Sequence, residues 1–322
     1  MKNLTRKLAA GLILGFLVFI ALAVLGDIRQ VGEELAGFTW SLVPLILAST
    51  VFGYVLRFVK WHYYLGRIGV NNISVRESAR IFVAGFPLAV TPGKAGEALK
   101  ATWLKRAVGT PTPKGLMVVL AERISDGLGV LLLSTVGVFA YRQYWPIFSI
   151  VAGALIGVIL ISQIRPLGRW LIDFSRRIPI VRRVADPLSE FYEGSYVLFR
   201  PKATLIAVAL GTVAWLGEGV AMYLVLLGLG VAPTTYTFGI AVFVLSFSTI
   251  VGAISALPGG LVAADGSIAG MLALLLGLSA TTAASATLLI RFATLWFGVG
   301  LGLLVWLTAS DLFAGEPDPK GA

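Results

Sequence analysis

The sequence contains no cysteine, one histidine and few charged residues. Without cysteine the 322-residue chain can form neither a disulfide nor a thiolate site, and the single His62 excludes a multi-histidine metal centre within one chain. Asp, Glu, Lys and Arg make up only 13% of the residues, about half their usual share in a soluble domain. The chain also lacks a P-loop, a serine-hydrolase elbow and a zinc motif. We therefore expect no metal, no cofactor and no enzymatic activity.

Apolar residues dominate what is present. They make up 57% of the chain, and the mean hydropathy is +0.90. A span needs about 20 apolar residues to cross roughly 30 Å of hydrocarbon. The sequence predicts an all-α polytopic membrane bundle, a single membrane domain over residues 1–322 with about six full spans. The predicted spans are Leu8–Leu25, Leu42–Leu65, Leu116–Ala140, Ile147–Gln163, Thr204–Leu229 and Ala283–Leu307.

Two further apolar segments are interrupted by Pro-Gly sequences. Ser78–Thr91 has about 14 residues before its break and would reach only about 21 Å as a helix, so a re-entrant hairpin is expected there. Phe238–Leu257 is longer and could cross fully or re-enter. Each is followed by a returning segment, Ala95–Val108 and Leu261–Leu278. The residues at the breaks are Pro92, Gly93 and Gly96 in the first and Pro258, Gly259 and Gly260 in the second.

The two breaks predict an internal repeat. Pro92 is followed by Arg123 and Pro258 by Arg291, each arginine lying inside the next apolar run. The predicted units are residues 42–140 and 204–309, preceded by a first span at 8–26. One linking span, 147–163, separates them, so the second unit enters from the opposite side. This is the inverted-topology repeat of many secondary transporters, whose broken helices meet near the midplane.

Basic residues collect in alternate connections. The tail before Leu8, the stretch Arg57–Lys114 and the connection Arg165–Lys202 hold most of the Lys and Arg, so these stretches are predicted to be cytoplasmic. Both termini, including the tail 310–322, then lie inside, in the plasma membrane of a prokaryote. In the connection 165–202, apolar residues with helical spacing predict an amphipathic helix on the membrane surface or capping the bundle. The net charge of +10 is explained by topology, and no nucleic-acid partner is expected.

Charged residues inside apolar spans are the candidate functional residues, because they are costly to insert. Arg123 and Arg291 are predicted to line a polar cavity and bind a phosphate, since a guanidinium matches phosphate oxygens. Lys94 and Lys100 would add charge at the cytoplasmic mouth. A structural alternative is pairing, of Arg123 with Asp126 or Glu97 and of Arg291 with Asp265 or Glu218. The candidate charge partners in the cavity are Glu97, Glu122, Asp126, Glu218 and Asp265.

These motifs together resemble a known family. Pro92-Gly93-Lys94-Ala95-Gly96-Glu97, Glu122-Arg123-x-x-Asp126, Pro258-Gly259-Gly260-Leu261 and Arg291 are similar to the flippase-like membrane domain of lysylphosphatidylglycerol synthases. Asp265 stands where the family usually has Glu. The resemblance implies translocation of a phospholipid or polyprenyl-phosphate-linked lipid between leaflets, with an anionic phospholipid or polyprenyl phosphate derivative as the partner. The synthases' aminoacyl-transferase domain is not expected.

Two other functions remain open at this point. The chain could transport a small soluble anion, or it could be a non-transporting membrane scaffold or accessory subunit. The sequence leaves the oligomeric state open.

Overall fold

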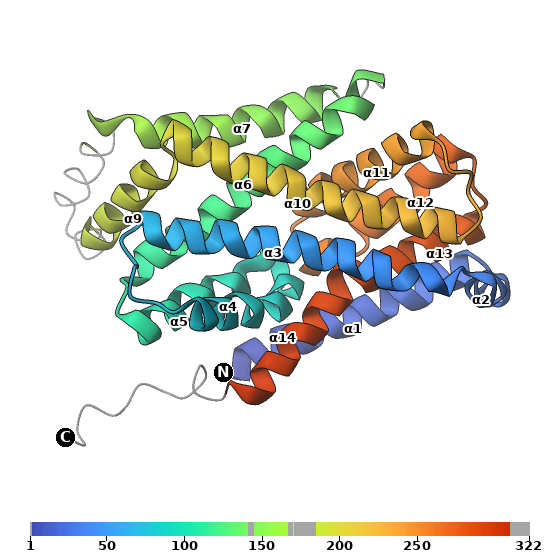
Figure 1. Ribbon diagram of the computed structural model, residues 1–322, viewed down its shortest axis with the longest axis horizontal. Helices are drawn as coiled ribbons and strands as arrows, with labels where there is room; N and C mark the ends of the chain where they lie inside the picture. Colours follow the sequence, from blue (N-terminus) through green and yellow to red (C-terminus); the bar gives the residue numbers. More distant parts are fainter. Residues whose placement is uncertain (1, 141–144, 167–169, 171–184, 310–322) are drawn as a thin grey trace.

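The computed structural model describes residues 2–140, 145–166, 170 and 185–309, and every regular element in this part of the chain is helical. The all-α bundle is therefore confirmed (Figure 1). The first half contains α1 (Lys2–Leu25), α2 (Ile28–Gly37), η1 (Trp40–Leu42), α3 (Val43–Arg67), α4 (Val75–Ala84), η2 (Phe86–Val90), η3 (Pro92–Ala98), α5 (Leu99–Val108), α6 (Thr112–Ala140) and α7 (Trp145–Gln163). The second half contains α9 (Ala185–Leu198), α10 (Pro201–Gly228), α11 (Thr235–Ile254), η6 (Pro258–Gly260), α12 (Ala263–Leu276), α13 (Ala280–Arg291), η7 (Phe292–Trp296) and α14 (Phe297–Thr308).

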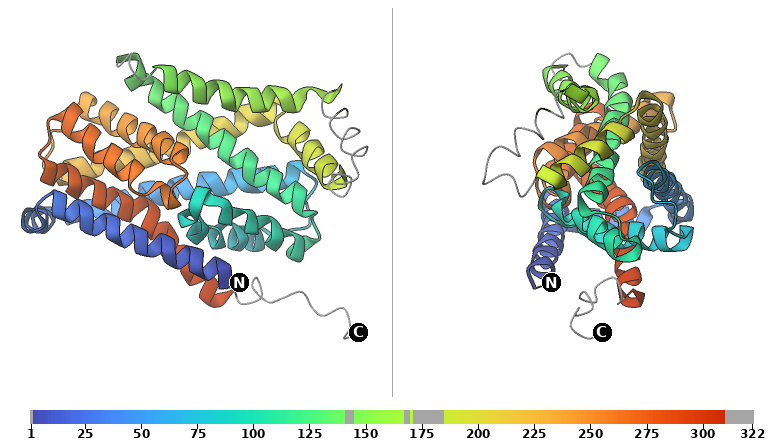
Figure 2. Two further views of the ribbon diagram at one scale, coloured as in Figure 1. Left: turned by 180° about the vertical axis from the view of Figure 1, so that it is seen from behind. Right: turned by 90° about the vertical axis from the view of Figure 1, so that its left-hand side faces the viewer.

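The two Pro-Gly breaks form hairpins that enter the bundle from opposite ends. In Figure 1 the pair α4–α5 lies toward the end where α3 finishes, and the pair α11–α12 lies toward the end that carries α2. The view from behind shows the same arrangement (Figure 2). The tips meet inside the molecule, where η2 and η3 both pack against η6. We call the two ends the α4–α5 end and the α2 end.

The two hairpins differ in length. α4 and α5 have ten residues each, about 15 Å of helix, so neither can cross a bilayer. α11 has 20 residues, and the second arm, Pro258–Leu276, has 19; each is long and apolar enough to span a membrane. In the described residues the other segments with that property are Trp40–Arg67, Pro201–Gly228 and Ala280–Thr308.

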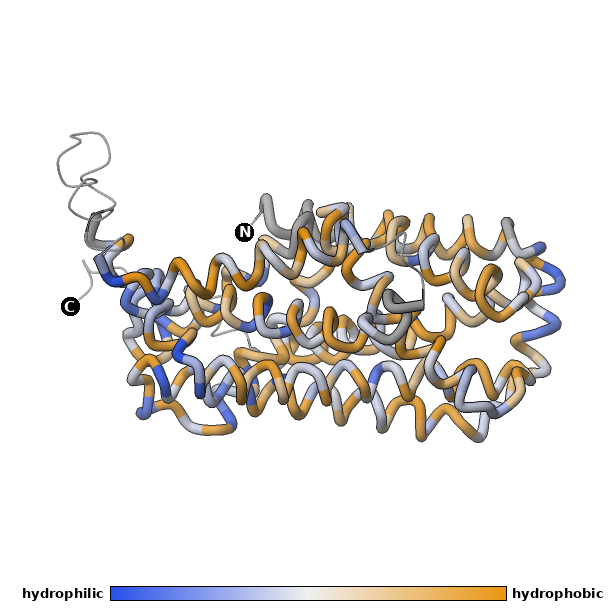
Figure 3. Tube along the Cα trace, turned by 90° about the horizontal axis from the view of Figure 1, so that it is seen from above, coloured by the Kyte–Doolittle hydropathy of each residue, from blue (hydrophilic) through white to orange (hydrophobic). Residues whose placement is uncertain are grey.

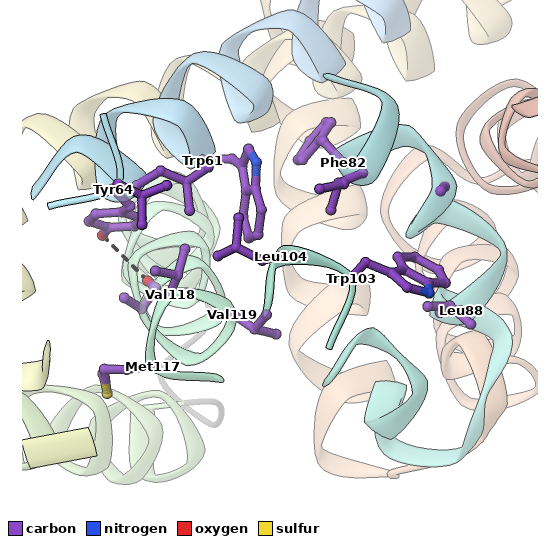
Figure 4. Close-up of a cluster of buried hydrophobic side chains, with 14 of the residues drawn as sticks. Trp61, Tyr64, Phe82, Leu88, Trp103, Leu104, Met117, Val118 and Val119 are labelled. Atoms are coloured by element: carbon purple, nitrogen blue, oxygen red, sulfur yellow. Dashed lines mark hydrogen bonds between the residues drawn. The ribbon is translucent and has the colours of Figure 1, made fainter. Parts of the chain in front are cut away.

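Hydropathy follows the long axis of the bundle. Polar residues gather at both ends, and the middle is mostly apolar (Figure 3). Around the first hairpin a buried apolar cluster joins α3, α4, α5 and α6. Trp61, Tyr64, Phe82 and Leu104 are among its members (Figure 4). This packing holds the short helices α4 and α5 against full-length ones.

Among the described residues, α2 and α9 lie outside both the predicted spans and the predicted hairpins. α2 is a mostly exposed helix capped at its N-terminus by Asp27, whose carboxylate accepts a hydrogen bond from the backbone N–H of Arg29. α9 packs against α6 and α7. The predicted amphipathic helix falls almost wholly on residues 167–184, which, apart from Trp170, lie outside the described residues.

Candidate functional site

A cavity of about 630 Å³ lies where the hairpin tips meet. Its walls include Ala95 of η3, Gly259 and Gly260 of η6, and residues of the long helices α3, α6, α10 and α13. Both arginines predicted from the sequence, Arg123 and Arg291, line it. The volume is in the range of ordinary ligand-binding pockets.

Arg123 connects α6 to the tip of the first hairpin. Its Nη2 lies 3.0 Å from Oε2 of Glu97 in η3, and its side chain is 36% exposed. Among the described residues its Nε has no hydrogen-bond acceptor. Nη2 of Arg57 and Nε of Arg291 also lack an acceptor there, but those side chains are only 14 and 12% exposed. Arg123 is therefore the cavity arginine most accessible to a ligand.

Local geometry fixes Glu97 in place. Thr91 precedes the break, and its buried hydroxyl donates to the carbonyl of Leu88 at 2.6 Å and accepts from the N–H of Gly96 at 2.8 Å. A Cβ at Gly96 would lie 2.8 Å from the Thr91 side chain, so only glycine fits. The Pro-Gly motif thus makes a compact turn that presents Glu97 to α6.

Arg291 is bound on two sides by the second hairpin. Its Nε lies 2.5 Å from Oδ1 of Asp265, and its Nη2 donates to the carbonyl of Gly259 at 3.0 Å. The other carboxylate oxygen of Asp265 accepts from the N–H of Val262, at the start of α12. Val262 has φ +70, which is strained for a β-branched residue. The side chain of Arg291 is only 12% exposed, and its contacts stabilise the tip.

A π-helix, η7, directly follows Arg291 in the last span. Tyr54 of α3 donates to the carbonyl of Thr294 within it at 2.5 Å. Such π-bulges are frequent at functional sites. Arg291 therefore lies beside the cavity, at the point where the last span changes from α-helical to π-helical hydrogen bonding.

Lys100 lies deeper than predicted. It is 3% exposed, its Nζ lies 2.7 Å from Oε2 of Glu122, and it is 4.6 Å from the centroid of the Trp61 ring. It does not lie at an open mouth, because its side chain is buried between Trp61 of α3 and Glu122 of α6. The side chain of Lys94 is outside the described residues, as are those of Pro92 and Gly93.

Two further cations in the bundle come from α3, and the sequence analysis missed both as site residues. Arg57 lies 2.5 Å from Oε1 of Glu218 and 4.4 Å from the centroid of the Trp215 ring. Lys60 is fully buried and lies 2.5 Å from Oδ1 of Asp126. Arg57 lines the cavity.

These contacts correct two of the alternative pairings. Asp126 shares a helix face with Arg123 but pairs with Lys60, and Glu218 pairs with Arg57 rather than Arg291. In the sequence Arg57 and Lys60 lie near the end of an apolar run, where basic residues ordinarily indicate topology. Their spacing of three, which places both on one helix face, was the signal available in the sequence.

Apart from Tyr54, Thr249, Trp215 and Thr294, the rest of the cavity wall is apolar. Leu120 of α6, Ile254 of α11 and Leu257 beside the second tip line it and are 37, 58 and 38% exposed. Val151 and Leu155 of α7 complete that side. The cavity therefore joins a charged region to a large apolar wall, a combination that suits an amphipathic ligand.

Comparison with known proteins places the chain in a family. The model described as the lysylphosphatidylglycerol synthase TM region matches residues 9–302. The chain belongs to this family. The resemblance noted in the sequence is therefore confirmed, and the matched region contains every cavity residue named above.

Two similar proteins are described as membrane proteins. The chain is 26% identical over 304 residues to a "UPF0104 membrane protein" of Methanothermobacter thermautotrophicus, covering 86% of this chain and 85% of that protein. A second protein of the same name and organism is 24% identical over 230 residues, covering 65 and 67% of the two chains. Family membership thus shows an integral membrane protein related to lipid-modifying enzymes.

Proposed function

We propose that this protein moves a phospholipid or polyprenyl-phosphate-linked lipid between the two leaflets of the membrane. The observation that carries the proposal is the cavity in which buried charges adjoin an exposed apolar wall. A charged headgroup would occupy the region around Arg123, while the acyl or prenyl chain follows the wall at Leu120, Ile254 and Leu257. A small soluble anion would need no such wall.

The phosphate would be bound by Arg123. Arg291 is already held by Asp265 and by the Gly259 carbonyl, and removing it from either would release the second hairpin tip. Arg123 has one carboxylate partner, a 36% exposed side chain and an unused Nε. A guanidinium with free N–H groups can bind a phosphate by donating two parallel hydrogen bonds to its oxygens.

The opposed hairpins offer a route for alternating access. Movement of either tip relative to the other would open the cavity toward one end of the bundle and close it toward the other. We further propose that the α4–α5 end faces the cytoplasm of a prokaryotic cell. The exposed basic residues Arg67, Arg76, Lys105 and Arg106 lie on or beside α3, α4 and α5 at that end.

The test is leaflet exchange of fluorescent phosphatidylglycerol and of fluorescent phosphatidylethanolamine, assayed separately, by the purified protein in proteoliposomes. Arg123→Gln should lower the exchange rate about tenfold or more while the protein stays folded, and Arg123→Lys should also lower it, because an ammonium cannot reproduce bidentate binding. The control is Arg29→Gln, since Arg29 forms an exposed pair with Glu33 on α2. Arg291→Gln should lower the thermal stability of the protein, and any loss of exchange should follow from that lower stability.

Three outcomes separate the candidate functions. Normal exchange by folded Arg123→Gln would refute the phosphate role. Uptake of inorganic phosphate without lipid exchange would favour a small-anion transporter. Absence of both activities in the wild-type protein would favour a scaffold or accessory subunit.

A further inference from the structure

The charged side chains of the cavity form pairs of opposite sign. Among the side chains that the structure describes, four cations line it (Arg57, Lys100, Arg123 and Arg291) together with four carboxylates (Glu97, Glu122, Asp126 and Glu218). The remaining partners, Lys60 and Asp265, are buried behind the wall and are also of opposite sign. Each of these cations lies within 3.0 Å of a carboxylate oxygen.

This pairing limits what can bind. A phosphate that approaches Arg123 competes with Glu97, whose side chain is only 6% exposed. If the phosphate displaces that carboxylate, a buried negative charge is left without a cation, which is strongly unfavourable. A headgroup that carries only negative charge supplies no replacement.

A headgroup with one phosphate and one ammonium solves this problem. The phosphate can take the guanidinium of Arg123, while the ammonium, a few bonds away in the same headgroup, takes the carboxylate of Glu97. Every charge then keeps a partner of opposite sign, and the total charge of the cavity does not change. We propose that the preferred substrate is a zwitterionic, amine-bearing phospholipid and that it binds by inserting its headgroup into the Arg123–Glu97 pair.

Exposure and position in the fold both select the Arg123–Glu97 pair as the one that admits the headgroup. The cation of the Arg123–Glu97 pair is 36% exposed, against 14% or less for the cations of the other four pairs. Glu97 belongs to the short helix η3 at a hairpin tip, whereas Asp126 and Glu218 belong to long helices. The inference rests on the proposed function, since it names the lipid that would occupy the same site.

Lipid binding can be measured apart from transport. The purified, delipidated protein would be mixed with equal concentrations of dioleoyl phosphatidylethanolamine and dioleoyl phosphatidylglycerol, and bound lipid counted by native mass spectrometry. We expect phosphatidylethanolamine to be retained about tenfold over phosphatidylglycerol, the ratio that one charge-assisted contact supplies. Equal retention, or preference for phosphatidylglycerol, would overturn the proposal without any variant being needed.

Two substitutions locate the contact. Glu97→Gln should bring the retention ratio close to one, because the ammonium loses its partner. Glu33→Gln removes a carboxylate that is 69% exposed on α2, outside the cavity, so the preference for phosphatidylethanolamine should remain. Loss of the preference in Glu33→Gln, or its persistence in Glu97→Gln, would contradict the assignment.

The result is independent of the transport assay. Preference for phosphatidylethanolamine in binding together with no leaflet exchange of either lipid would remove the translocase function and keep the headgroup site. Leaflet exchange with no headgroup preference would keep the translocase function and remove the headgroup site.

Discussion

Single residues in this bundle are stabilised by partners that come from distant parts of the chain. Lys60 of α3 is fully buried, and its partner Asp126 lies 66 residues later, on α6. Removing one partner of a buried pair leaves a charge without compensation, which costs about 3–5 kcal/mol. Replacing both partners by apolar residues removes that cost.

Substitution of this pair should therefore be strongly non-additive. Asp126→Asn should lower the free energy of unfolding in detergent by about 3–5 kcal/mol, and the double variant Lys60→Met with Asp126→Leu should recover most of it. Chemical unfolding curves of the three proteins would measure this. A single variant as stable as the wild type would show that the pair contributes nothing to the fold.

The residue scale is also where prediction from the sequence was least complete. Arg123 and Arg291 could be identified because each interrupts the middle of an apolar run. Arg57 and Lys60 lie nearer the end of their run, where basic residues ordinarily mark the cytoplasmic side. Which carboxylate pairs with which cation depends on helix packing, so Asp126 could not be assigned to Lys60 from spacing within α6.

At the scale of elements, apolar runs and Pro-Gly breaks located the helices well. The predicted span Ala283–Leu307 is observed as the continuous helical segment α13, η7 and α14. Its π-helix has no simple sequence pattern, because it depends on what packs beside it. α2 lies between two spans as a short amphipathic helix, and ten residues are too few for hydropathy to reveal.

Close approach of α14 to the first hairpin gives a prediction at this scale. A Cβ at Gly302 would lie 2.2 Å from Cδ of Pro87 in η2, whereas a Cβ at Gly300, on the same helix, meets nothing within 4 Å. Gly302→Ala should lower the thermal midpoint, since overpacking costs about 1–3 kcal/mol. Gly300→Ala should leave the midpoint unchanged or raise it, because alanine favours helix. Equal effects of the two substitutions would show that α14 does not pack on η2 this closely.

At the scale of the whole molecule, the distribution of basic residues predicts which end of the bundle faces the cytoplasm. Asn71 is an exposed residue in the connection between α3 and α4, and Ala36 is exposed on α2, at the other end. If the α4–α5 end is cytoplasmic, Asn71→Cys should be protected from an impermeant thiol reagent in intact bacterial cells, and Ala36→Cys should be labelled. The native chain has no cysteine, so each variant reports on one position.

Permeabilised cells provide the control, in which both cysteines should react. Labelling of Asn71→Cys and protection of Ala36→Cys in intact cells would invert the proposed topology. The inverted arrangement of the hairpins would remain, because it depends on the fold and not on the side that faces the cytoplasm.

The order in which the buried pairs are synthesised has a consequence for biogenesis. α3 leaves the ribosome with Arg57 and Lys60 while Asp126 and Glu218 have yet to be made. An unpaired charge costs up to about 2.5–3.5 kcal/mol in an inserting helix, the upper figure applying at its centre. α3 is therefore expected to settle in the bilayer only after α6 and α10 have been translated. In nascent chains truncated before α6, α3 should remain in contact with the translocon. In full-length chains α3, α6 and α10 should enter the bilayer together.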